Sequence, residues 1–100
     1  MYELINEPIQ VYADFTDKGP KPKSFTWRDN EYVIKEIGFA YTAVKGDTKM
    51  FYFSVSTETE TYKIVFNPKT LSWKLEEIYL DTDFSTTNSL NEKNNNAYRM

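Results

Sequence analysis

The sequence contains no cysteine and no histidine. Without cysteine, the chain can form no disulfide, no thiolate metal site and no cysteine nucleophile. Without histidine, it lacks the commonest general base near neutral pH and the commonest metal ligand. We therefore expect neither a cofactor nor a bound metal, and we predict that the protein is not an enzyme.

Long apolar runs and an excess of positive charge are also missing. No apolar run approaches the roughly 20 residues that a membrane-spanning helix needs. Residues 1–4 do not begin a basic region followed by an apolar one, so no signal peptide is expected. The net charge is -3 and the pI is about 4.9, which argues against general affinity for nucleic acid or anionic membranes. Together with the absence of disulfides, these features predict a cytoplasmic protein without a membrane partner.

Aromatic residues, by contrast, are abundant: the chain has eight Tyr, seven Phe and two Trp among its 100 residues. Such side chains bury large areas and suit the pleated surface of β-strands. Helical periodicity is weak, and turn signals recur at intervals of roughly 8–12 residues, as in antiparallel sheets. The sequence predicts an all-β fold of about six antiparallel strands in a meander, forming a strongly curved sheet or a small barrel.

Alternation of apolar and polar residues with a period of two locates most of the predicted strands. The stretches that show it are 9–15, 23–27, 49–57, 62–66 and the segment that starts at Leu71. Pro8 suits the beginning of the first strand, where no hydrogen-bond donor is needed. We expect residues 16–20 to form a turn and residues 28–31 to form a tight hairpin connection.

The alternation changes phase at two places. In the long strand predicted over 32–43, apolar residues move from even to odd positions, which predicts a β-bulge or bend near Lys35 and Glu36. Gly38 supports the bend, and two separate strands with a kink between them are the alternative. In the last strand, the phase shifts near Glu76 and Glu77 and predicts a second irregularity, with a short helix over 75–80 as the alternative.

The composition changes after residue 80. The segment that follows is polar, contains few apolar residues and includes the run Asn94–Asn96. Such a segment cannot offset its ordering entropy by burial. We therefore expect one β domain over residues 1–80 and a polar, mobile tail over residues 81–100.

One candidate site is a basic and aromatic stretch around the second predicted strand. Lys21, Lys23, Trp27 and Arg28 lie in a segment without acidic residues. Cations contact phosphates and exposed aromatic rings stack on bases, so these residues form a candidate surface for nucleic acid or another partner. The alternative is that Trp27 shares a core face with Phe25 while the lysines decorate a loop.

A second candidate is a set of tyrosines, namely Tyr12, Tyr52, Tyr62 and Tyr79. If they gather on one face of the sheet, the aromatic patch would mark a contact with a protein or a ligand. Alternatively, their rings cover the margin of the core and keep their hydroxyls in water.

Several stretches of the sequence show a shared pattern of aromatic and aliphatic strand positions. These stretches are Glu7–Val11, Phe25–Arg28, Tyr32–Ile34, Tyr62–Phe66 and Trp73–Tyr79. In this pattern the chain resembles a group of small uncharacterised bacterial β-rich domains. Some members of that group resemble modules appended to proteins related to translesion DNA polymerases. The resemblance implies a small β domain and carries no catalytic residues to this chain.

Taken together, these features predict a non-enzymatic β module that acts by contact with another macromolecule. A protein partner is expected, because exposed strand edges can accept a partner strand. The alternative is a nucleic-acid-binding accessory domain that uses Lys21, Lys23, Trp27 and Arg28.

Overall fold

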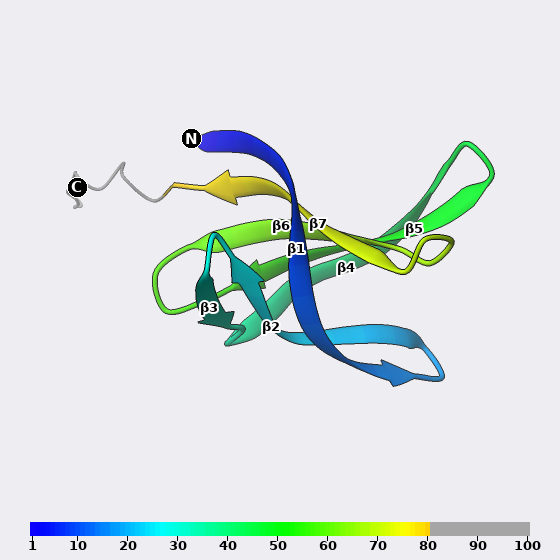
Figure 1. Ribbon diagram of the computed structural model, residues 1–100, viewed down its shortest axis with the longest axis horizontal. Coiled ribbons are helices and arrows are strands. Elements are labelled where there is room, and N and C mark those ends of the chain that lie inside the picture. Colours follow the sequence, from blue (N-terminus) through cyan, green and yellow to red (C-terminus); the bar gives the residue numbers. More distant parts are fainter. Residues whose placement is uncertain (81–100) are drawn as a thin grey trace, which may run out of the picture.

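The computed structural model describes residues 1–80, which form one antiparallel sheet of seven strands (Figure 1). The strands are β1 (Tyr2–Thr16), β2 (Gly19–Trp27), β3 (Asn30–Val33), β4 (Glu36–Lys45), β5 (Thr48–Ser56), β6 (Thr61–Asn67) and β7 (Ser72–Tyr79). The predicted all-β antiparallel fold is confirmed, whereas the mobile tail predicted over 81–100 lies outside the described residues. Within residues 1–80, no helix is long and apolar enough to cross a membrane.

The sheet consists of two meanders that meet in its middle. Its strand order is β3-β2-β1-β7-β6-β5-β4, so pairing of β1 with β7 joins the first three strands to the last four. The two edge strands, β3 and β4, follow each other in the chain and are separated by residues 34–35 alone. The sheet must therefore curl strongly to bring its edges together at this point, although β3 and β4 do not pair and the sheet stays open.

Strand β1 is long because its two halves pair with different strands, one in each meander. Residues 2–9 pair with β7, whereas residues 10–16 pair with β2. Pro8 therefore lies inside the strand and not at its predicted beginning. At this position β1 is paired on one side only, and such an edge-like setting tolerates a residue without an N–H.

The first turn is shorter than predicted. It consists of Asp17 and Lys18, and both Gly19 and Pro20 already belong to β2. Pro20 and Pro22 are tolerated in this strand because β3 pairs only with its later residues, which leaves one edge of β2 open at the prolines. The predicted hairpin connection at 28–31 is confirmed, with the turn itself at Arg28 and Asp29.

The core lies on the inner face of the curved sheet. Alternating residues from five of the strands form its buried part, and Phe25, Phe53, Ile64 and Trp73 are each exposed by 8% or less. The aromatic rings contact one another across strands, as in the pair Phe66 and Trp73, whose centroids are 4.8 Å apart. The predicted two-residue alternation therefore does generate one apolar layer.

The first predicted phase shift is resolved by a strand break. The bulge predicted near Lys35 and Glu36 is wrong, and the alternative of two separate strands is confirmed: β3 ends at Val33 and β4 begins at Glu36. The reason is a change of partner strand, because the Ile34 N–H donates to the Lys23 carbonyl at 2.9 Å and the Lys35 N–H to the Ser56 carbonyl at 2.7 Å. The bulge itself lies at Gly38, which is an extra residue in the pairing of β4 with β5.

The second predicted phase shift is confirmed. Lys63 pairs with Glu77 and Ile64 pairs with Leu75, so Glu76 is an extra residue in β7. The alternative of a short helix over 75–80 is wrong, because the strand continues beyond the irregularity to Tyr79. The extra residue restores the inward direction of the next apolar side chain, Ile78, which is exposed by only 6%.

Candidate contact surface

The structure places the predicted contact residues along β2 and the turn that follows it. Two of them, Trp27 and Arg28, converge on a single carboxylate, that of Glu7 in β1. The guanidinium group donates from Nη2 to Oε2 at 2.7 Å and from Nε to Oε1 at 3.2 Å. The indole Nε1 donates to Oε1 at 2.7 Å, and the guanidinium lies over the indole ring at 4.5 Å.

These contacts define the electrostatics of the turn. The hydrogen bond from Arg28, followed by that from Trp27, holds the pKa of the Glu7 carboxyl below its usual range. The same carboxylate raises the pKa of Arg28 above its ordinary value. Trp27 also packs against the core and is only half-exposed, so most of its stacking surface and its N–H already have contacts within the domain.

The two lysines, Lys21 and Lys23, lie nearer the beginning of β2 than Trp27 does, and both are exposed. The Nζ of Lys23 is 3.7 Å from the Asp14 carboxylate on β1, and both side chains face solvent. Sequence reasoning missed the carboxylates of Asp14 and Glu7 because they belong to a different strand. Only the register of the β1–β2 hairpin, in which Gln10 pairs with Thr26, brings them alongside the basic residues.

The predicted tyrosine set is divided between three environments. Tyr62 is a core residue, exposed by 1%, and its hydroxyl donates to the Glu60 carboxylate at 3.1 Å. Burial, followed by the neighbouring charge of Glu60, raises the pKa of Tyr62 to about 12. Tyr12 is 75% exposed on β1, whereas Tyr52 and Tyr79 belong to strands on the other half of the sheet.

An aromatic cluster occupies the outer face of β4, β5 and β6. The rings of Tyr41 and Tyr52 stack with centroids 5.0 Å apart and an angle of 6° between their planes. The Nζ of Lys63 lies 5.5 Å from the Tyr52 centroid and 3.4 Å from the Glu76 carboxylate. Burial acts to lower the pKa of Lys63, but the Tyr41 hydroxyl and the Glu76 charge outweigh it and raise the pKa above its ordinary value.

Strand β4 stands out because it is long and open. Among residues 1–80 it pairs with β5 alone, so its second edge is open in this part of the chain, and nine of its ten residues are exposed. All residues between its terminal Glu36 and Lys45 are uncharged. The exposed fraction is 73% for both Phe39 and Val44 and 47% for Tyr41.

Such an edge is uncommon in a folded protein. Natural sheets usually protect edge strands with charges, proline or very short length. The opposite edge strand, β3, follows that rule, since it has only four residues. The sequence does not distinguish β4 from a core strand, because its alternating aromatic residues produce the same pattern as a buried face.

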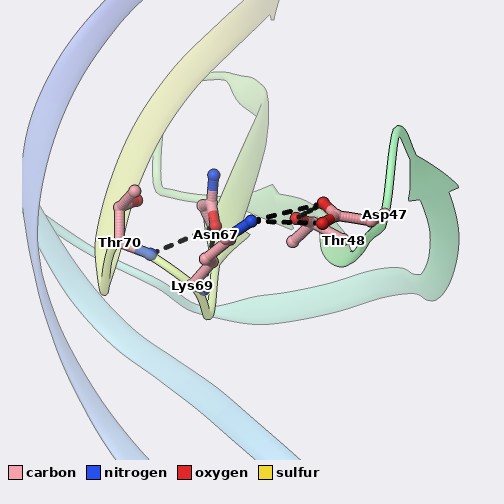
Figure 2. A network of polar contacts seen from close by, with 5 residues as sticks. All are labelled: Asp47, Thr48, Asn67, Lys69 and Thr70. Carbon is pink, nitrogen blue, oxygen red and sulfur yellow. Dashed lines mark hydrogen bonds and ion pairs between the residues drawn. The ribbon is translucent and has the colours of Figure 1, made fainter.

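The turns next to β4 hold its far end in place (Figure 2). The Nζ of Lys69, in the β6–β7 turn, lies 3.2 Å from the Asp47 carboxylate in the β4–β5 turn. The side-chain oxygen of Asn67 accepts hydrogen bonds from the backbone N–H groups of Lys69 at 2.9 Å and Thr70 at 3.3 Å, which shapes the turn that presents the lysine. Lys69, followed by Thr48, lowers the pKa of Asp47.

A small apolar hollow lies beside the inner face of β4. It has a volume of about 180 Å³, and its lining includes Pro20 and Phe53 together with Ala40 and Thr42 of β4. A side chain projecting inward next to β4 would reach this hollow. Among residues 1–80, no group of three or more His, Cys, Asp or Glu is placed to hold a metal ion.

Comparison with protein-family models, curated proteins and solved structures yields no match for this chain. The geometry of the described residues is therefore the basis for the functional argument, and the resemblance to small bacterial β-rich domains stays a prediction.

Proposed function

We propose that the protein is a non-enzymatic contact module that binds an extended segment of a protein partner along the open edge of β4. The observation that carries this proposal is the free edge itself, which is ten residues long and paired on one side only. In strand addition, backbone hydrogen bonds supply affinity, and pockets for alternate side chains supply selectivity. Strand β4 offers both kinds of interaction.

The side chains around β4 give an added strand two different environments. On the outer face, partner side chains would lie next to Phe39 and Tyr41, which both expose large aromatic surface. On the inner face, the alternate side chains would reach the apolar hollow beside Ala40 and Thr42. A partner segment with aliphatic or small aromatic residues at every second position fits this arrangement.

The alternative of a nucleic-acid-binding module receives less support. Its predicted surface has two carboxylates among the cations, since Glu7 binds Arg28 and Asp14 lies near Lys23. The chain as a whole carries a net charge of -3. Both features oppose the release of counterions from phosphates that drives nucleic-acid binding.

Selection of peptides from a displayed random library on the full chain tests the proposal. We expect enriched peptides with alternating apolar residues, and we expect their binding to shift the amide NMR signals of β4 more than those of β3. Phe39→Lys and Ala43→Lys should each weaken peptide binding at least about tenfold, because lysine on an edge disfavours strand addition. Tyr12→Lys, at a residue 75% exposed on β1, is the matched control and should leave binding unchanged.

Two results would count against this function. Peptides that bind but shift signals only in β2 and the β2–β3 turn would show that the open edge is not the contact surface. Binding of single-stranded or duplex DNA at moderate salt, lost in Lys21→Ala or Lys23→Ala and unaffected by Phe39→Lys, would favour the nucleic-acid alternative.

A further inference from the structure

We infer that β4 of a second copy of this chain is the strand that fits the open edge, in antiparallel order around a two-fold axis. The inference rests on the proposed function, because self-pairing uses the same free edge. It adds the identity of the partner and the direction of its strand. Three features of β4 support it: the charges at its ends, the position of its bulge and the sizes of its side chains.

The charges at the two ends of β4 are opposite in sign. Glu36 is the first residue and Lys45 is the last, with eight uncharged residues between them. Antiparallel pairing of two copies brings each carboxylate to the ammonium end of the other strand. Parallel pairing would instead place like charges side by side, which is unfavourable for directly opposed residues. The strand is therefore complementary to itself in one direction only.

The bulge places both charges on the same face of the sheet. Lys45 shares the outer face with Tyr41, because residues separated by an even number along a regular strand point the same way. Glu36 pairs with Ser56, which lies on the same face of β5 as Tyr52. If Gly38 were a regular member of the strand and not an extra residue, the alternation would turn the carboxylate inward. With Gly38 as the extra residue, Glu36 and Lys45 of two copies related by a two-fold axis normal to the sheet face each other.

Counting residues along β4 in the same way also defines the register in which the two copies of β4 pair. If Tyr41 pairs with its own symmetry mate, Phe39 lies opposite Ala43 of the second copy, a large side chain against a small one. When the extra residue Gly38 is passed over, Glu36 then comes opposite Lys45 of the second copy. In this one register, Glu36 and Lys45 each face an opposite charge, and the exposed ring of Phe39 faces a small side chain.

The assembly closes as a dimer. Pairing across a two-fold axis uses the same strand in both copies, so a complete β4–β4 contact occupies this edge in both chains. The other edge strand, β3, has four residues, which makes it a poor template for further addition. The expected product is one continuous sheet shared by two chains.

Sedimentation velocity of the full chain over a range of concentrations tests the inference. We expect a monomer–dimer equilibrium. Glu36→Lys and Lys45→Glu should each lower the association constant roughly tenfold, because each change replaces two opposite-charge pairs by two like-charge pairs. The double variant Glu36→Lys/Lys45→Glu should restore association. An equimolar mixture of the two single variants should form a heterodimer more readily than either variant forms a homodimer.

Disulfide trapping tests the register, since the chain has no natural cysteine. Tyr41→Cys places two thiols directly opposite each other at the two-fold axis, within the distance that a disulfide spans. We expect a covalent dimer under mild oxidation. Ala43→Cys, on the same face of the same strand, lies opposite Phe39 of the second copy and should not crosslink. Tyr12→Cys controls for chance encounters between exposed thiols.

The outcomes separate this inference from the proposed function. A chain that stays monomeric at every concentration, but still binds library peptides along β4, would overturn self-pairing and leave strand addition standing. A monomer that also binds no peptide would overturn both. A dimer that is unaffected by charge reversal and is trapped through Tyr12→Cys would show association through a different surface.

Discussion

At the scale of single residues, Gly19 combines two constraints that no other residue type satisfies. Its φ is +112°, a conformation that residues with a Cβ rarely adopt. A Cβ at this position would also lie 3.1 Å from the Phe51 ring of β5. The β1–β2 hairpin therefore approaches the Phe51 ring of β5 closely at Gly19.

We expect Gly19→Ala to lower the free energy of unfolding by about 2 kcal/mol, because it adds both strain and crowding. Gly46→Ala is the matched control, since Gly46 has a φ of +65° but no atom within 4 Å of the added Cβ. It should cost about 1 kcal/mol, the backbone contribution alone. Urea denaturation measures both values, and equal losses would show that the Phe51 ring moves aside freely.

Side-chain burial was the feature that the sequence predicted best at this scale. Alternation indicates one apolar face in each of the stretches 23–27, 49–57 and 62–66 and in the last strand, and Phe25, Phe53, Ile64 and Trp73 on these faces are all buried. The partners of polar residues could not be predicted in the same way. The carboxylate of Glu7 reaches Trp27 and Arg28 through a strand pairing whose register depends on a turn three residues shorter than the sequence suggested.

At the scale of elements, the β4–β5 turn is linked to the neighbouring β6–β7 turn. The link is the ion pair of Lys69 with Asp47, which joins two turns that lie 22 residues apart in the sequence. Both side chains are exposed, so the contact affects local opening of the hairpin more than global stability.

We expect Lys69→Met to speed hydrogen exchange of the backbone amides between residues 44 and 49, while the centre of β6 stays protected. Lowering the pH should likewise reduce the protection of these amides relative to their intrinsic exchange rates, which are themselves slower in acid. The pKa of Asp47 is lowered in the folded chain, so the stabilisation is present above its ordinary value of 3.8 and is lost as the pH falls through the folded value. Lys21→Met removes an exposed charge on β2 and serves as the control. Equal exchange in wild type and Lys69→Met would contradict this role.

Most strands could be located from the sequence, but their ends and partners could not. The alternation in residues 49–57 and 62–66 predicts β5 and β6 to within about one residue at each end, because each strand has one apolar face. The first seven residues of β1 lack a comparable pattern, and Pro8 suggested a beginning that the structure does not have. The break at residues 34–35 left a local signal, the change of phase near Lys35 and Glu36, but that signal does not show that the chain changes partner strands there.

At the scale of the whole molecule, Tyr62 sets a limit on alkaline stability. Its pKa is raised from 10.0 to about 12 in the folded chain, so the folded state holds its proton more tightly than the unfolded state does. The resulting stabilisation is complete below pH 10.0 and is lost as the pH rises through the folded value of about 12.

We therefore expect the free energy of unfolding of the wild type to fall more steeply between pH 10 and pH 12 than that of Tyr62→Phe. Denaturant titrations across this range measure the difference. Tyr12→Phe changes a tyrosine that is 75% exposed and provides the control. Parallel pH profiles for wild type and Tyr62→Phe would show that the buried hydroxyl does not ionise in the unfolding reaction.

The sequence predicted the class of the fold but not the order of its strands or its contact surface. Strand order depends on the β1–β7 pairing, which joins residues separated by most of the domain and therefore produces no local pattern. The open edge of β4 was hidden for a related reason. Its aromatic alternation predicts a strand, but whether that strand is central or at an edge depends on which strands lie beside it.

Pairing of β1 with β7 also determines when the domain can form during synthesis on the ribosome. Residues 2–9 leave the exit tunnel before the other strands of this sheet, but their partner strand is complete only when residue 79 has left it, and the Leu80 N–H then donates to the Met1 carbonyl at 2.9 Å. Contacts this distant in the chain slow folding. The nascent chain must therefore keep half of its first strand unpaired until nearly the whole domain has been made, and molecular chaperones have that interval in which to act.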